Sequence, residues 1–127
     1  MTISGDPHPP PEPRPAARVA ALRASSDSDG ATTVIHLAGS LRCATAPALR
    51  EAVDAVLGQR PATIVLNLAE LHADDELGLW VLPAMAGDVA RHGAELVIAA
   101  PYRALRVRLR RLGGHQLDII ENVPATS

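Results

Sequence analysis

The fold of this chain is decided by the stretch Leu71-His-Ala-Asp-Asp-Glu-Leu-Gly-Leu-Trp-Val-Leu82. A continuous apolar run at residues 63–68 precedes it, as in a buried strand, and apolar residues at helical spacing follow its acidic centre. The stretch therefore predicts a strand, an acidic turn and a helix start. Backbone N–H groups at a helix start lack intrahelical partners and favour carboxylates, here those of Asp74, Asp75 and Glu76. We expect Asp75 to cap the helix and Glu76 to lie in its first turn, and this turn is the predicted functional site.

The composition of the chain limits which functions this turn can have. The chain has 127 residues, 47% of them hydrophobic, which is enough for one domain with one core. A net charge of −2, with arginine as its only strongly basic residue type, gives no reason to expect nucleic acid. The single cysteine, Cys43, excludes an internal disulfide and is expected to be a buried, inert thiol. No stretch approaches the roughly 20 apolar residues of a membrane span, so we expect a cytoplasmic protein without direct membrane insertion.

The pattern of prolines and apolar residues divides the chain into three parts. Residues 1–16 hold six prolines between positions 7 and 15 and are expected to be a disordered tail. Residues 17–123 form the predicted domain, and residues 124–127 a frayed C-terminus. Within the domain, we expect strands at 18–24, 32–38, 63–68, 95–100 and 117–120, a turn at 25–30, and helices at 45–58, 77–92 and 101–112. This alternation predicts an α/β fold with a mostly parallel sheet of four to five strands and about three helices.

The helix that follows the acidic turn has two contrasting faces. Its core-facing stripe is expected to contain Gly78, Leu82, Met85, Ala86 and Val89. The opposite face carries a large aromatic residue beside small ones and is a candidate docking patch, formed by Trp80, Pro83, Ala84 and Gly87. Because Pro83 removes an intrahelical hydrogen bond, we also expect a kink after the first turn and a half.

Polar residues elsewhere have simpler expected roles. His36 is expected to be a hydrogen-bonded strand histidine, and Asn67 to make a local turn hydrogen bond, with anchoring of the acidic turn as the alternative. The arginine-rich helix, with arginines at 103, 106, 108, 110 and 111, places positive charge near a helix C-terminus, where it complements the dipole. A nucleic-acid patch is less consistent with the absence of interleaved aromatic residues, and an acidic partner is the remaining alternative.

Two motifs and the order of elements resemble the STAS domain, named for sulfate transporters and anti-sigma-factor antagonists. Gly39-Ser-Leu-Arg-Cys-Ala-Thr-Ala-Pro-Ala-Leu49 is similar to the family's segment of glycine, any residue, leucine and aspartate that runs into the first helix. Asp75-Glu-Leu-Gly-Leu79 is similar to its signature of aspartate, serine, serine or threonine, glycine and leucine. The resemblance covers roughly residues 18–123 and implies a STAS-like α/β sandwich.

The resemblance also implies a function and a departure from it. In the antagonist branch, the serine after the aspartate is phosphorylated by an anti-sigma factor that is also a kinase, and the unphosphorylated domain binds that kinase. Here the phosphoacceptor-equivalent position is Glu76, followed by Leu77, so the turn has no hydroxyl. One glutamate charge imitates a phosphoserine of about −1.5 to −2 imperfectly. Arg42 replaces the family's aspartate, and we expect it to pair with Asp75 or Glu76 if the two loops sit together.

The sequence thus favours a non-catalytic interaction module without a cofactor, related to anti-sigma-factor antagonists and lacking the phosphorylation switch. Its expected partner is an anti-sigma factor or a related kinase-like protein, in the regulation of transcription by partner-switching. The expected partner-binding residues are Arg42, Asp74, Asp75, Glu76, Leu77, Gly78, Trp80 and Pro83.

Two other classes compete with this interpretation. In an accessory subunit of a membrane lipid or anion transport system, the Trp80 and Pro83 face would dock a transporter ATPase. A metal site or enzyme would use the hard ligands His72, Asp74, Asp75 and Glu76. The spacing of these four residues matches no metal loop, and helix capping accounts for the carboxylates.

Overall fold

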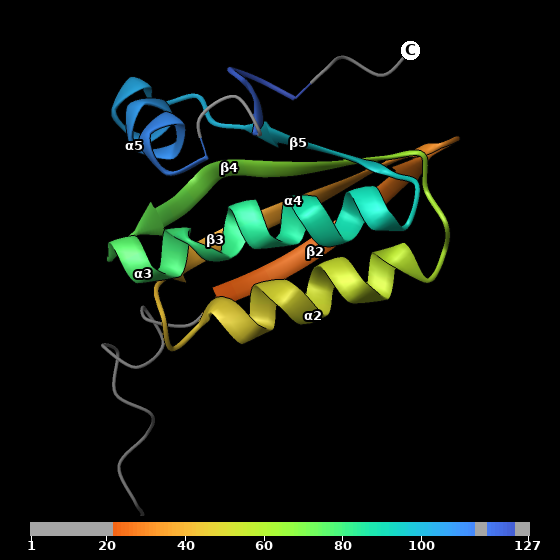
Figure 1. Ribbon diagram of the computed structural model, residues 1–127, viewed down its shortest axis with the longest axis horizontal. Helices are drawn as coiled ribbons and strands as arrows, with labels where there is room; N and C mark the ends of the chain where they lie inside the picture. The colour runs from red at the N-terminus through yellow and green to blue at the C-terminus, as the bar shows by residue number, and fades with distance from the viewer. Residues whose placement is uncertain (1–21, 114–116, 124–127) are drawn as a thin grey trace, which may run out of the picture.

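The computed structural model describes residues 22–113 and 117–123, which form one α/β unit (Figure 1). The tail predicted at 1–16, the domain start predicted at 17 and the C-terminus predicted at 124–127 lie outside the described residues. The strands are β2 (Leu22–Asp29), β3 (Thr32–Leu41), β4 (Thr63–Ala73), β5 (Glu95–Ala99) and β6 (Asp118–Ile120). The helices are α2 (Ala46–Leu57), α3 (Glu76–Leu79), α4 (Val81–Arg91) and α5 (Arg103–Gly113).

The described strands form one mixed sheet in the order β2-β3-β4-β5-β6. The β2–β3 pair is antiparallel, and each later pair is parallel. Each parallel connection from β3 to β6 includes at least one helix, as crossover connections require. The predicted mostly parallel sheet of four to five strands with about three helices is confirmed, the predicted middle helix being observed as α3 and α4.

Two layers of apolar side chains hold the sheet. The larger core joins alternate residues of the strands to helices α2, α4 and α5, with Leu37, Leu66, Leu82 and Leu109 at most 2% exposed. Figure 1 shows α2 and α4 side by side on one side of the sheet, and Asp88 of α4 forms an ion pair with Arg50 of α2. A smaller core on the alternate strand positions consists of Val34, Val65, Val97 and Ala99. The sheet is therefore apolar on both faces along its centre, as expected of buried parallel strands.

Strand β2 differs from the prediction. The segment expected to be a turn, residues 25–30, is strand as far as Asp29, and the turn is confined to Gly30 and Ala31. Gly30 has a φ of +64°, a conformation that glycine adopts without steric cost. Residues 23–29 are exposed and are mostly serine and aspartate. The sequence therefore shows no alternation of apolar and polar residues that would indicate a strand. The strand exists because its backbone pairs with β3 from Leu22↔Gly39 to Asp29↔Thr32, which overrides a low β-propensity.

The two polar strand residues singled out from the sequence form one network. The Asn67 side-chain amide lies 3.0 Å from His36 Nδ1, and its oxygen accepts the Ala69 N–H at 3.1 Å. His36 Nε2 lies 3.2 Å from an Asp27 carboxylate oxygen. Both expected roles are confirmed: His36 is a hydrogen-bonded strand histidine, and Asn67 makes a local bond. The register of β3 and β4 shifts between His36 and Ala38, beside this local bond.

The helix predicted at 77–92 is interrupted. Residues Glu76–Leu79 form α3, Trp80 separates it from α4, and α4 ends at Arg91. Pro83 accounts for the place of the interruption, because it has no N–H to donate to the carbonyl of Leu79, the last residue of α3. The predicted core stripe is observed: Gly78, Leu82, Met85 and Val89 are buried and Ala86 is half-buried. On the opposite face Trp80, Ala84 and Gly87 are exposed and Pro83 is half-buried.

Candidate functional site

The acidic turn lies where β4 ends and α3 begins. Asp75 has an extended backbone and its Oδ1 accepts the Gly78 N–H at 2.6 Å, so it caps α3 as predicted. Glu76 is the first residue of α3, and its side chain is 57% exposed. Asp74 is exposed, and its N–H donates to the Leu41 carbonyl at 3.0 Å. The predicted cap and first-turn carboxylate are therefore both in place.

The loop between β3 and α2 packs directly against this turn. Oδ2 of Asp75 accepts the N–H of Cys43 at 3.3 Å. Thr45 orders the same loop, since its hydroxyl donates to the Ser40 carbonyl at 2.7 Å and accepts the Arg42 N–H at 3.0 Å. A Cβ placed on Gly78 would lie 2.4 Å from Arg42 Cα. The two motifs far apart in the sequence thus form one structural unit, and Gly78 is what permits their close approach.

The expected pairing of Arg42 with Asp75 or Glu76 is wrong. The two oxygens of Asp75 accept backbone N–H groups, and Glu76 is bound by Arg108. Within the described ranges, Arg42 Nε is buried and has no hydrogen-bond partner. The condition of that expectation is met, because the two loops do lie together, but the side chain that pairs with Glu76 is Arg108 and not Arg42.

Arg108 of α5 is the residue that the sequence did not identify as part of this site. Its Nε and Nη2 donate to Glu76 Oε1 at 2.9 and 2.6 Å, and its Nη1 donates to the Ala73 carbonyl at 3.1 Å. One guanidinium therefore connects α5 to the end of β4 and the start of α3. The ion pair joins residues 32 positions apart, so no local spacing rule indicates it.

Two large apolar side chains stand exposed beside the acidic turn. Leu77 is 67% exposed and Trp80 is 52% exposed, and they are three residues apart across α3. Residues at this spacing lie on the same face of a helix. Leu77 and Trp80 together with Glu76 are called the α3 surface below.

A model of the family described as "Mlab, STAS domain" matches residues 24–121, which is most of the chain. The chain belongs to the STAS-domain family. The match includes the complete acidic turn and the complete β3–α2 loop, and it confirms the resemblance inferred from the two motifs.

Solved structures agree with this assignment. The STAS domain superimposes on the crystal structure of an anti-sigma factor antagonist from Mycobacterium paratuberculosis with a TM-score of 0.64, at 20% identity, over 80% of this chain and 87% of that one. It is also similar to the crystal structure of Mglu, with a TM-score of 0.53 and 28% identity, over 62% of this chain and 20% of that one. Among curated proteins, none matches the chain. The first superposition shows that the two proteins share a fold.

Cys43 of the STAS domain is exposed, so the expectation of a buried thiol is wrong. The contact of the β3–α2 loop with Asp75 uses the Cys43 backbone N–H and not its side chain. Sequence alone suggested burial because free cysteines are usually buried.

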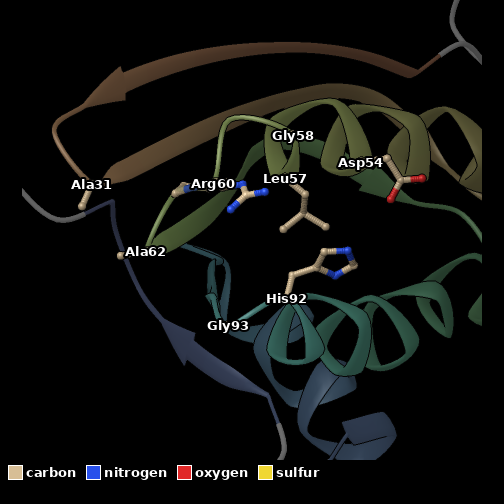
Figure 2. Close-up of a pocket in the computed structure, with 9 residues that line it drawn as sticks. Ala31, Asp54, Leu57, Gly58, Arg60, Ala62, His92 and Gly93 are labelled. Atoms are coloured by element: carbon tan, nitrogen blue, oxygen red, sulfur yellow. The ribbon is translucent and has the colours of Figure 1, made fainter.

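The STAS domain also has a pocket of about 740 Å³ at the other end of the parallel strands. Figure 2 shows Leu57, Arg60 and His92 around its opening, and its rim includes Ala31, Ala62 and Gly93. Helices α2 and α4 end beside it at Leu57 and Arg91, and helix C-termini carry partial negative charge. Ligands of open α/β sheets bind at the carboxyl ends of the strands, where the acidic turn lies, and this pocket lies at the opposite ends.

The described residues contain no group of three or more His, Cys, Asp or Glu side chains arranged to hold a metal ion. His72 is exposed near the end of β4, and the two oxygens of Asp75 are occupied by backbone N–H groups. Across residues 22–113 and 117–123, no helix combines the length and the apolar character that crossing a bilayer requires.

Proposed function

We propose that this STAS domain is a non-catalytic protein-interaction module of the anti-sigma-factor-antagonist type, acting in the cytoplasm. Its proposed partner is an anti-sigma factor or a related kinase-like protein, whose binding regulates transcription by partner-switching. The observation that carries the proposal is the α3 surface, where an exposed carboxylate lies beside two exposed apolar side chains. Interfaces commonly centre on aromatic side chains that become buried when the partner binds, with polar groups around them.

The proposed module lacks a phosphorylation switch at this turn. The STAS resemblance aligns Glu76 with the family's phosphoacceptor serine and Leu77 with the next hydroxyl residue, so neither position accepts a phosphate here. Arg108 binds Glu76 with two hydrogen bonds to one oxygen, an arrangement that also suits a phosphate oxygen. We therefore expect the turn to hold one permanent charge state, partly neutralised by α5.

The partner-binding set extends around the α3 surface. Asp74 contributes a second exposed carboxylate and Pro83 a half-buried apolar surface on the same side of α4 as Trp80. The α3 surface is supported by Arg42, Asp75 and Gly78, because Asp75 and Gly78 hold α3 against the β3–α2 loop. Contact residues and supporting residues should accordingly respond differently to mutation.

Calorimetry with the anti-sigma kinases of the same organism tests the proposal. We expect the native protein to bind one of them, and Trp80→Ala to weaken binding by more than tenfold, about 1.4 kcal/mol, because a central aromatic anchor is lost. Tyr102→Ala is the matched control, since Tyr102 is 57% exposed but lies outside the α3 surface. Tenfold tighter binding by Glu76→Ser would support the phospho-mimic interpretation. If neither the native protein nor Glu76→Ser binds any candidate, the antagonist assignment fails.

A second candidate function uses the same exposed residues. In an accessory subunit of a lipid or anion transport system, Trp80 and Pro83 would dock a transporter ATPase. Co-purification with such an ATPase, lost in Trp80→Ala, together with a permease encoded by a neighbouring gene, would favour this function over the first.

A further inference from the structure

Helix α5 divides its five arginines into two structural groups. Arg106 donates to the carbonyls of Ala100 and Pro101, and Arg108 binds Glu76 and the Ala73 carbonyl. The other three, Arg103, Arg110 and Arg111, are exposed and form no ion pair with any described residue. Among residues 22–113 and 117–123, contacts explain only the first group.

The second group shares one side of the helix. At about 100° per residue, Arg103, Arg110 and Arg111 fall within an arc of roughly 100° that also contains Val107. Val107 is 37% exposed, while Leu105 and Leu109 are buried on the opposite side. The three arginines and Val107 are called the α5 surface below. It is a basic face with an apolar centre, about 12 Å long at 1.5 Å per residue.

The dipole and the composition of α5 do not account for this surface. The helix dipole favours Arg110 and Arg111 in the last turn but disfavours a positive charge on Arg103, the first residue of α5. The helix contains no acidic residue. The chain has 12 basic and 14 acidic residues, and five of the basic residues lie in α5. The chain outside α5 therefore has seven basic and 14 acidic residues, which is a net charge of −7. Ordinary solvated surfaces intersperse both signs, whereas α5 has five arginines and no acidic residue.

We infer that the α5 surface binds a short acidic segment of a partner protein. Guanidinium groups bind carboxylates with paired hydrogen bonds, and Val107 offers an apolar contact between them. A span of about 12 Å matches roughly four extended residues. A nucleic acid or a membrane would extend beyond the patch and meet the negative remainder of the chain, whereas a short peptide remains within it. The α5 surface shares no residue with the α3 surface, so the inference does not depend on the proposed function.

The test uses fluorescence polarisation with labelled oligoglutamate peptides of four, eight and sixteen residues at low salt. We expect binding that weakens at least tenfold between 0.05 and 0.5 M salt, and an affinity that gains less than threefold beyond eight residues. The triple variant Arg103→Gln/Arg110→Gln/Arg111→Gln should bind at least tenfold more weakly. The control triple Arg23→Gln/Arg60→Gln/Arg91→Gln removes the same charge from exposed positions elsewhere and should bind within threefold of the native protein.

Three results would overturn the inference. The first is that the eight-residue peptide fails to bind the native protein, and the second is that both triple variants weaken binding equally. The third is that a twelve-residue oligothymidylate or phosphatidylserine vesicles bind the α5 arginines more tightly than the eight-residue peptide, which would assign the surface to an extended polyanion. Circular dichroism of both triple variants verifies that each is folded.

Discussion

A methyl group added at Gly78 should lower the stability of the folded protein strongly. A Cβ at this site would lie 2.4 Å from Arg42 Cα and 2.7 Å from both its N and C atoms. Carbon atoms in favourable contact are about 3.5–4.0 Å apart, so the β3–α2 loop and α3 would have to separate by roughly 1 Å. The obstructing atoms are backbone, which cannot rotate away as a flexible side chain does. The separation would stretch the hydrogen bond from Cys43 N–H to Asp75.

We expect Gly78→Ala to lower the free energy of unfolding by about 2 kcal/mol. Because the obstructing atoms are backbone, the cost should lie at the upper end of the range for overpacking, about 3 kcal/mol, and the better helix propensity of alanine returns at most about 1 kcal/mol. For a domain of this size, 2 kcal/mol corresponds to a fall in Tm of about 10 °C. Urea denaturation followed by far-ultraviolet circular dichroism measures the change.

Gly87→Ala is the matched control in α4. Its new Cβ would lie 3.7 Å from Arg91 Nη1, an ordinary contact with a movable side chain. This variant should be more stable than the native protein by about 0.5–1 kcal/mol, because alanine favours the helix. Equal stability of Gly78→Ala and the native protein would refute the close approach of the two loops.

Three further predictions concern the same region. Asp75→Ala should cost about 1–2 kcal/mol of unfolding free energy, because the capping bond to the Gly78 N–H is lost. Asp75→Asn should recover most of this loss. An unchanged urea midpoint in Asp75→Ala would contradict the cap. Arg108→Gln should cost less than about 1 kcal/mol, because its partner Glu76 is more than half exposed, and a loss above 2 kcal/mol would show a buried role instead. Cys43 should react with a thiol reagent in the native protein as fast as in urea, and native-state protection would contradict its exposure.

Sequence reasoning identified the acidic turn because its signals are local. A capping aspartate followed by a glycine and an apolar stripe requires no knowledge of distant residues, and Asp75 and Gly78 occupy the expected positions. The family motifs identified the loop around Arg42 as the second segment of the resemblance, and the structure shows that this loop lies beside the turn. Parallel strands that are buried on both faces, such as β4, were equally evident from their continuous apolar runs.

The features that sequence reasoning missed all depend on distant partners. Arg108 reaches Glu76 because α5 packs beside the end of β4, and five arginines in one helix gave no sign of which would bind it. Cys43 is exposed because of the path of a loop and not because of its own chemistry. The strand from Leu22 to Asp29 is created by its neighbour β3, while its own residues favour a turn.

That strand has a consequence for how this protein can change. Because main-chain pairing holds β2 and residues 23–29 are exposed, most substitutions there should alter stability by no more than about 0.5 kcal/mol. Random drift can therefore rewrite this segment while the sheet persists, which makes β2 a poor marker of ancestry. For the same reason it is a suitable place to graft a recognition peptide, since among the described strands β2 lies at the end of the order away from β5 and β6.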